Sequence, residues 1–187
     1  MSKEYYELAH HIIKLEPLST EGWILDIGGG GEGVIGELMG KQVVAIDLRK
    51  DELEETHNDS MKIVMDATEL KFLDESFPMV TAYYALMYMP VDVQKKVFTE
   101  VFRVLEPGGH FLLWDAKIPT KPDTDLDVVV ITQTIELPDK TIQTGYGCRW
   151  PEKELTLEHY SNLGRKQGLT VSQQVDSEGK LYIKFKK

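Results

Sequence analysis

Short apolar runs alternate with amphipathic segments over the first two thirds of the chain. The runs are bounded by glycines or polar turns, which is typical of strands buried on both faces. The predicted strands are Trp23–Ile27, Val43–Ile46, Lys62–Met65, Phe77–Tyr84 and His110–Trp114. The predicted helices between them are Val34–Met39, Lys50–Thr56 and Asp92–Leu105. Because strands that alternate with helices favour right-handed crossovers, we expect an α/β fold with a doubly wound, mostly parallel sheet.

The last third of the chain has a different pattern. Asp127–Glu136 is rich in Val, Ile and Thr, residues 137–140 supply turn chemistry, and Thr141–Thr144 is typical of a return strand. These segments predict a β-hairpin, within residues 119–150, inserted after the fifth strand. The predicted elements that follow are a helix at Glu154–Gln167 and strands at Leu169–Val175 and Lys180–Phe185. Since no linker or repeat is visible, we expect residues 1–187 to form a single domain.

The N-terminal segment predicts a helix. Apolar and aromatic residues recur at helical spacing over Tyr5–Leu15, and the pattern stops before Pro17. His10 and His11 belong to this predicted helix, which we assign to residues 1–22 together with the turn that follows it.

Composition and charge narrow the function classes. The chain has 187 residues and a net charge of −10, which disfavours nucleic acid because phosphate binding needs clustered basic groups. No apolar stretch is long enough to predict a membrane span. Cys148 is the single cysteine, so an internal disulfide and a thiolate metal cluster are both excluded. We therefore expect a cytoplasmic protein without a metal centre.

A glycine cluster after the first predicted strand is the most informative segment. Asp26-Ile27-Gly28-Gly29-Gly30-Gly31-Glu32-Gly33 lies where open α/β sheets bind ligands, at the carboxyl ends of the strands. Gly28, Gly30 and Gly33 satisfy the dinucleotide fingerprint, and Asp47 follows at the spacing expected of a ribose partner. Asp26 argues against a pyrophosphate, because a nearby carboxylate repels it, and favours a positively charged ligand.

Three motifs in order resemble the class I S-adenosylmethionine-dependent methyltransferases, in particular the small UbiE-like domain. They are Asp26-Ile27-Gly28-Gly29-Gly30, the segment from Asp66-Ala67 to Phe77, and Arg103-Val104-Leu105-Glu106-Pro107-Gly108-Gly109. The similarity covers roughly Trp23 to Trp114. It implies a seven-stranded Rossmann-like sheet with an antiparallel C-terminal strand, and an N-terminal helix that folds over the cofactor as a lid.

The resemblance also implies a set of residues that bind S-adenosylmethionine. The acid and glycines of the first motif would hold the methionine end, and Asp47 would accept hydrogen bonds from the ribose hydroxyls. Leu48 would pack on the adenine, Asp66 would accept from its amino group, and the Ala67 amide would donate to its ring. The full set is Asp26, Ile27, Gly28, Gly29, Gly30, Asp47, Leu48, Asp66, Ala67, Ala82 and Tyr83.

The sequence departs from the family pattern near the chemistry. Glu32 occupies the usual third glycine position, Pro78 replaces an acid, and Met87-Tyr88 stand where many relatives have a histidine pair. Candidate groups for proton transfer are therefore Tyr83, Tyr84, Tyr88 and Asp115, at the carboxyl ends of strands. Methyl transfer needs a base only if the acceptor must lose a proton.

Methyl transfer to an unidentified small molecule is the favoured function. A protein that binds S-adenosylmethionine without catalysis, or less favourably a nicotinamide-dependent oxidoreductase, would also fit the glycine pattern. The aromatic, glycine-rich segment 145–151 could line the acceptor pocket, or the hairpin could pair with a second subunit in a homodimer.

Overall fold

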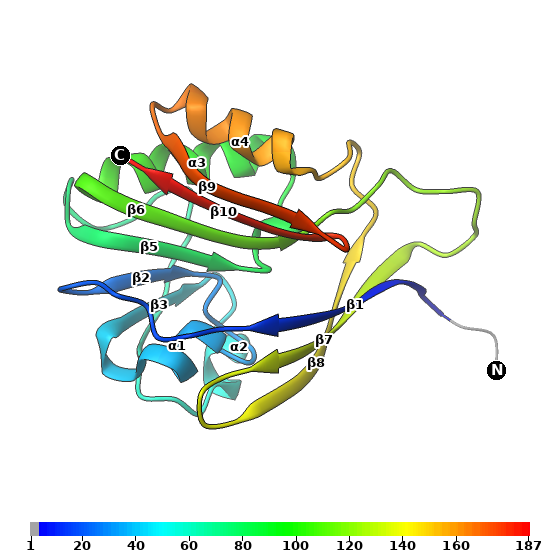
Figure 1. Cartoon of the computed structure of the whole chain (residues 1–187), viewed down its shortest axis with the longest axis horizontal. Helices are drawn as coiled ribbons and strands as arrows, with labels where there is room; N and C mark the ends of the chain where they lie inside the picture. Colours follow the sequence, from blue (N-terminus) through cyan, green and yellow to red (C-terminus); the bar gives the residue numbers. More distant parts are fainter. Residues whose placement is uncertain (1–3) are drawn as a thin grey trace.

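The computed structural model describes residues 4–187, which build two β-sheets (Figure 1). The larger sheet has the strand order β4-β3-β2-β5-β6-β10-β9. Its strands are β2 (Ile24–Ile27), β3 (Val43–Asp47), β4 (Met61–Val64), β5 (Phe77–Tyr83), β6 (Leu105–Ala116), β9 (Thr170–Ser177) and β10 (Lys180–Lys186). The first five pair in parallel, whereas β10 runs antiparallel to β6 and to β9. The predicted doubly wound sheet with an antiparallel C-terminal strand is confirmed.

Helices cover both faces of this sheet. They are α1 (Val34–Met39), α2 (Lys50–Glu55), α3 (Val91–Val104) and α4 (Leu157–Lys166), with short 3₁₀ turns η1 (Gly40–Gln42) and η2 (Leu86–Tyr88). Figure 1 shows α3 and α4 on one face and α1 with α2 on the other. In the described part of the chain, no helix combines the length and the apolarity needed to cross a membrane.

The smaller sheet has the order β1-β7-β8 and contains the predicted hairpin. Strands β7 (Val128–Glu136) and β8 (Thr141–Arg149) pair antiparallel around the turn at residues 137–140, so the hairpin prediction is confirmed. Strand β8 extends five residues beyond the predicted Thr144 to Arg149. Strand β1 (Tyr6–Lys14) pairs in parallel with β7, over 120 residues away in sequence.

The predicted N-terminal helix is wrong, because residues 6–14 form strand β1. His11 and Leu15 are buried, whereas Ile12 is 58% exposed, so the side chains alternate between the two faces. Because the polar His11 points inward and the apolar Ile12 points outward, the sequence does not show alternating apolar and polar residues. Its apolar positions instead follow a helical spacing. The β7 edge, which the local sequence does not reveal, supplies backbone hydrogen-bond partners and thereby decides the structure.

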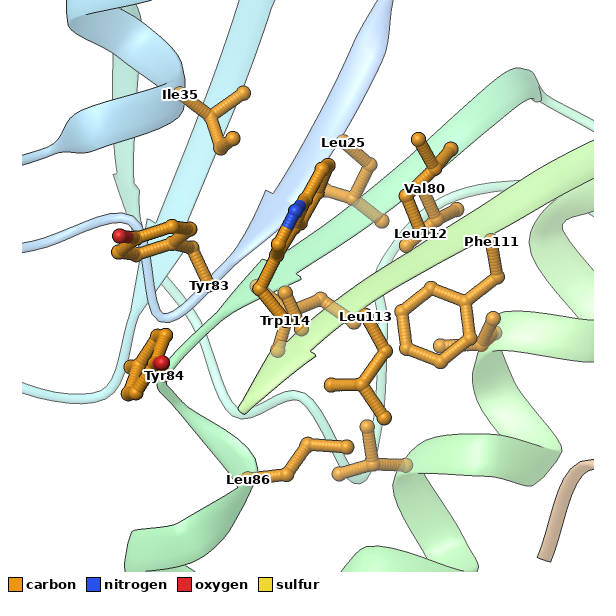
Figure 2. Close-up of a cluster of buried hydrophobic side chains, with 14 of the residues drawn as sticks. Leu25, Ile35, Val80, Tyr83, Tyr84, Leu86, Phe111, Leu112, Leu113 and Trp114 are labelled. Carbon is orange, nitrogen blue, oxygen red and sulfur yellow. The ribbon is translucent and has the colours of Figure 1, made fainter. Parts of the chain in front are cut away.

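The core between the large sheet and α3 is built from interlocking aromatic rings. The rings of Phe98, Phe111 and Phe185 contact one another at centroid distances of 5.5–5.7 Å. Gly164 of α4 lies directly over Phe185, where a Cβ atom would overlap the ring. Figure 2 shows Phe111 near the helices, while Tyr83, Tyr84 and Trp114 gather at the ends of β5 and β6.

The smaller sheet packs against the end of the larger one through side-chain hydrogen bonds. The Tyr83 hydroxyl donates to Gln133 Oε1 of β7 at 2.8 Å. The Thr144 hydroxyl of β8 donates to the Glu32 carboxylate in the glycine loop. The smaller sheet therefore stands beside the glycine loop and the carboxyl end of β5.

Candidate functional site

A cavity of about 820 Å³ opens at the carboxyl ends of β2, β3 and β5. Its volume lies within the usual range for small-molecule sites. The residues assigned from the sequence that line it are Asp26, Ile27, Gly28, Gly30, Asp47, Leu48, Asp66, Ala67, Tyr83 and Tyr88. Gly29, Ala82 and Asp115 are not part of the lining. The glycine loop, the tip of β3 and the Asp66-Ala67 segment thus come together in space, although they are far apart in sequence.

The glycine loop is folded tightly against its surroundings. The amides of Gly28 and Gly29 both donate to the Ile46 carbonyl, at 2.9 and 3.0 Å. Gly28 has φ +71°, and a Cβ there would lie 2.5 Å from the Ala85 Cβ. Such a conformation and such a contact admit only glycine, because every other residue would be both strained and in collision.

Gly30 lets two acidic side chains approach the loop. A Cβ at this position would lie 2.9 Å from Asp47 Oδ2 and 2.6 Å from the Glu52 Cβ. The absence of side chains at Gly28 and Gly30 therefore leaves a cradle of bare backbone beside these carboxylates.

Asp26 is 2% exposed and is held by a single side-chain hydrogen bond. Thr81 Oγ1 donates to its Oδ1 at 2.7 Å. Burial, reinforced by the nearby Asp47 charge and opposed by the Thr81 hydrogen bond, raises the pKa of Asp26 to about 7. The carboxyl group is thus poised to ionise when a positive charge reaches it.

Asp47 and Asp66 lie at the tips of neighbouring strands. Asp47 Oδ1 accepts from the Arg49 amide at 2.9 Å, which orients the carboxylate at the end of β3. Asp66 Oδ1 accepts from both the amide and the hydroxyl of Thr68 at 2.8 Å. These hydrogen bonds lower the pKa of Asp66, so it stays ionised. Leu48, 70% exposed, completes this side of the cavity.

The cavity lining is strongly acidic. Its carboxylates are Asp26, Glu32, Asp47, Glu52, Glu55 and Asp66, and Arg49 is its one basic residue. Arg49 is itself paired with Asp51 and, at 2.7 Å, with Glu52. The lining therefore attracts cationic groups and repels a pyrophosphate.

Tyrosines form another part of the lining, which we call the tyrosine wall. Tyr83 ends β5, Tyr84 follows it, Tyr88 lies in η2, and Tyr146 belongs to β8. The rings of Tyr84 and Tyr146 stack at a centroid distance of 5.5 Å. The sequence names Tyr84 as a candidate group, and the aromatic and glycine-rich composition of segment 145–151 is the signal that indicates Tyr146.

Asp115 lies on the other side of the turn that carries Tyr88. Its Oδ1 accepts from the Ala116 amide at 2.8 Å and its Oδ2 accepts from the Tyr160 hydroxyl at 3.0 Å. The Met87 amide also contributes a hydrogen bond, which ties the carboxyl to η2. Burial raises the pKa of Asp115 to about 7. This environment places Asp115 as a support of η2 behind the cavity wall.

Among residues 4–187, no group of three His, Cys, Asp or Glu side chains could hold a metal ion. Cys148 is buried, and this burial raises the pKa of its thiol to about 12, so the group is an inert thiol at neutral pH.

The profile of the methyltransferase domain matches residues 25–113, the segment that carries the glycine loop and both strand-tip acids. This match agrees with the resemblance of the three sequence motifs to the class I S-adenosylmethionine-dependent methyltransferases. S-adenosylmethionine is the cofactor of this class.

Curated methyltransferases and solved structures resemble the chain to different extents. A sterol 4-C-methyltransferase of Caenorhabditis elegans is 33% identical over 56% of the chain and 34% of its own length. The ubiquinone/menaquinone biosynthesis C-methyltransferase UbiE of Desulfotalea psychrophila is 36% identical over 54% of the chain and 44% of its own length. The chain thus spans less than half the length of these methyltransferases.

Solved methyltransferases share the fold at low identity. A methyltransferase structure from Methanosarcina mazei matches with a TM-score of 0.61 and 17% identity, covering 91% of this chain and 94% of that one. A second, from Clostridium acetobutylicum, matches with a TM-score of 0.60 and 16% identity over 87% of this chain and 82% of that one. At such identities the likeness shows the Rossmann-like methyltransferase fold alone.

Proposed function

We propose that this methyltransferase domain transfers a methyl group from S-adenosylmethionine to a small molecule that carries a ring. The observation that carries the proposal is one cavity with two chemically different sides. A glycine cradle bordered by carboxylates forms one side, and a wall of tyrosines forms the other.

The residues present fit the cofactor. Bare backbone at Gly28 and Gly30 provides a cradle that a Cβ would fill. Asp26 would face the positively charged methionine end, and Asp47 would accept hydrogen bonds from the ribose hydroxyls. Leu48, Asp66 and Ala67 would hold the adenine. When bound, the cofactor supplies a methyl group that is already activated by a positively charged sulfur.

The residues of the protein orient the acceptor and exclude water. Tyr146 and Tyr88 bring aromatic, half-polar side chains to the lining, with the buried Tyr83 and Tyr84 beside them, and such a lining suits a ring. Two relatives are a sterol methyltransferase and a quinone-pathway methyltransferase by name, which supports a ring-bearing acceptor. With one ion-paired Arg in the lining, an anionic acceptor is disfavoured.

The remaining expectations stay part of the proposal. We expect a cytoplasmic protein whose acceptor is not a nucleic acid, given the net charge of −10. A homodimer through the hairpin stays a prediction. Because β1 pairs with β7, the unpaired edge of the hairpin itself is that of β8.

Calorimetric titration with S-adenosylhomocysteine tests the cofactor assignment. Asp47→Ala should weaken binding by about 1–3 kcal/mol, the usual cost of leaving hydrogen-bond partners unpaired. Asp51→Ala, which removes an exposed carboxylate on the neighbouring α2, is the matched control and should change affinity little. No binding by the wild-type protein, or equal affinity of wild type and Asp47→Ala, would refute the assignment.

Transfer of a labelled methyl group to a panel of ring compounds tests the acceptor. The panel contains 2-naphthol, 2-naphthalenethiol, an aromatic amine and a cyclic ketone, with a naphthalene sulfonate as the anionic comparison. We expect turnover of neutral ring compounds only. Binding of S-adenosylhomocysteine without turnover of any compound would favour a non-catalytic binding protein, and NADH binding would favour an oxidoreductase.

A further inference from the structure

A buried histidine stands behind the tyrosine wall. His11 of β1 is 1% exposed, and its Nδ1 lies 2.7 Å from the Tyr84 hydroxyl oxygen. Its Nε2 is buried and has no well-formed hydrogen bond among the described residues. This nitrogen faces the turn at Gly179, where a Cβ would lie 3.4 Å away. A fully buried imidazole whose second nitrogen has only a weak contact with the Glu178 backbone calls for an explanation, because buried polar groups are nearly always well paired.

The His11–Tyr84 hydrogen bond connects two cavities. Tyr84 lines the large cavity described above. His11 lines a second cavity of about 300 Å³ on its far side, together with Lys117, Glu154 and Glu178. The two side chains therefore form a continuous polar path from the tyrosine wall to a separate opening in the molecule.

Tyr84 is held in an unusual backbone conformation. Its φ is +48°, a left-handed geometry that is strained for a bulky residue. Stacking on Tyr146 and the hydrogen bond to His11 hold the ring in place despite this strain. Such strain at a cavity wall fixes the direction of one hydroxyl group, and this is a common feature of functional positions.

The protonation states suit proton transfer. Burial, together with the charges of Lys180 and His10, lowers the pKa of His11 to about 4, so the imidazole is neutral at pH 7. A neutral Nδ1 can accept the Tyr84 proton, which leaves the lone pairs of the hydroxyl oxygen free. Burial also raises the pKa of Tyr84 strongly, so a lasting phenolate is disfavoured and the proton must pass through the pair in one movement.

We propose that Tyr84 and His11 form a proton relay from the large cavity to the second one, used when the methyl acceptor must lose a proton. The inference rests on the proposed function. As the acceptor oxygen bonds to the methyl carbon and the carbon–sulfur bond breaks, the acceptor proton passes to the Tyr84 oxygen. The Tyr84 proton passes to His11 Nδ1, and the Nε2 proton leaves to water in the second cavity. The products are the methylated acceptor, the thioether and one proton.

Tyr84 is thus the catalytic residue, and His11 acts through it as a positioning residue. Charged groups on several elements surround His11 and can change its pKa. They are His10 on β1, Lys117 after β6, Glu154 before α4, and Glu178 and Lys180 at the β9–β10 turn. Because Lys180 and His10 oppose a charge on His11 and Glu178 favours it, the imidazolium is short-lived and passes its proton on.

The test compares two matched acceptors at about pH 8, where a phenol keeps its proton and an aromatic thiol has lost most of its own. With 2-naphthol, Tyr84→Phe and His11→Gln should lower kcat by about 100- to 10,000-fold, the usual contribution of acid–base catalysis. With 2-naphthalenethiol, kcat should change by less than about threefold, because no proton has to be moved. His57→Gln, an exposed histidine after α2 that lines neither cavity, is the matched control and should behave as wild type.

Calorimetry and histidine ring NMR separate failure of the relay from failure of the proposed function. S-adenosylhomocysteine should bind both variants with wild-type affinity. Equal losses with naphthol and thiol, or no loss with either, would overturn the relay. If wild type methylates neither compound, the proposed acceptor class fails and the ¹⁵N spectrum decides the relay. A neutral His11 ring protonated at Nε2, and shifted by Tyr84→Phe, supports it; a ring protonated at Nδ1, or unaffected by Tyr84→Phe, overturns it.

Discussion

The affinity for S-adenosylhomocysteine should depend on pH through Asp26. Burial raises the pKa of this carboxyl to about 7, so the free protein holds it mostly protonated at pH 6. The ammonium group of the ligand stays charged in this range, and it favours the ionised carboxylate. Binding must then release a proton from Asp26. Affinity should therefore rise as the pH rises toward 7, and level off above it.

The size of the effect follows from the pKa. With a pKa of about 7, the ionised fraction of Asp26 rises from about 9% at pH 6 to about 50% at pH 7. A ligand that binds only the ionised form would gain about fivefold in affinity over this interval, or about 1 kcal/mol. Working below pH 7 keeps the ligand amino group charged, since its own pKa lies near 8.

Calorimetric titration at about pH 6.0, 6.5 and 7.0 covers the lower half of the Asp26 titration. It measures how steeply the affinity depends on pH. Asp26→Asn should bind more weakly and lose the pH dependence. Asp115→Asn is the matched control, because Asp115 is equally buried and has a similarly raised pKa but lies outside the cavity lining. A flat wild-type profile, or an equal slope in Asp26→Asn, would refute the reasoning.

Further predictions concern stability, measured by chemical denaturation. Gly28→Ala should destabilise the protein more than Gly108→Ala, because both positions have positive φ but only the first lacks space for a Cβ. The extra loss of unfolding free energy should be about 1–3 kcal/mol. Equal losses would contradict the packing argument. Gly164→Ala should cost a similar amount by overlapping Phe185, and an unchanged midpoint would refute this. The carboxyl of Asp115 stays protonated to a higher pH in the folded state, where its pKa is about 7, than in the unfolded state, where it is 3.8. It therefore lowers the unfolding free energy as pH rises from about 4 to 7, by up to about 1.4 kcal/mol per pH unit. Asp115→Asn should remove this contribution and leave the equal one of Asp26, so an unchanged slope would contradict the assignment.

The larger sheet was predictable because its sequence signals are local. Strand β3 (Val43–Asp47), for example, is largely buried, forms a continuous apolar run and is followed by the polar helix α2. Glycines that cannot be replaced mark the loop after β2. The predicted strand beginning at His110 was too short, since β6 starts at Leu105 and its pairing with β5 is irregular between Phe77 and Met79. A turn-like Pro-Gly-Gly sequence hid this extension.

The smaller sheet was only half predictable. The hairpin of β7 and β8 has its turn in the sequence, whereas β1 depends on a partner more than 120 residues away. No pattern within residues 6–14 indicates that β7 has a free edge with which this segment can pair. For the same reason the positions of His11 and Tyr146 around Tyr84 could not be derived, since each comes from a strand whose place is fixed by tertiary pairing.

The division between predictable and unpredictable parts coincides with a division of tasks in the proposed mechanism. The cofactor side of the cavity consists of local motifs, because a glycine turn and strand-tip acids need only the regular sheet beneath them. The acceptor side is assembled by long-range contacts: Tyr83 to Gln133, Tyr84 to His11 and Thr144 to Glu32. Substitutions in β1 or β8 can therefore reshape the acceptor wall while the glycine cradle stays in place. Changes of acceptor should map to the smaller sheet, and changes of cofactor affinity to the tips of β2 and β3.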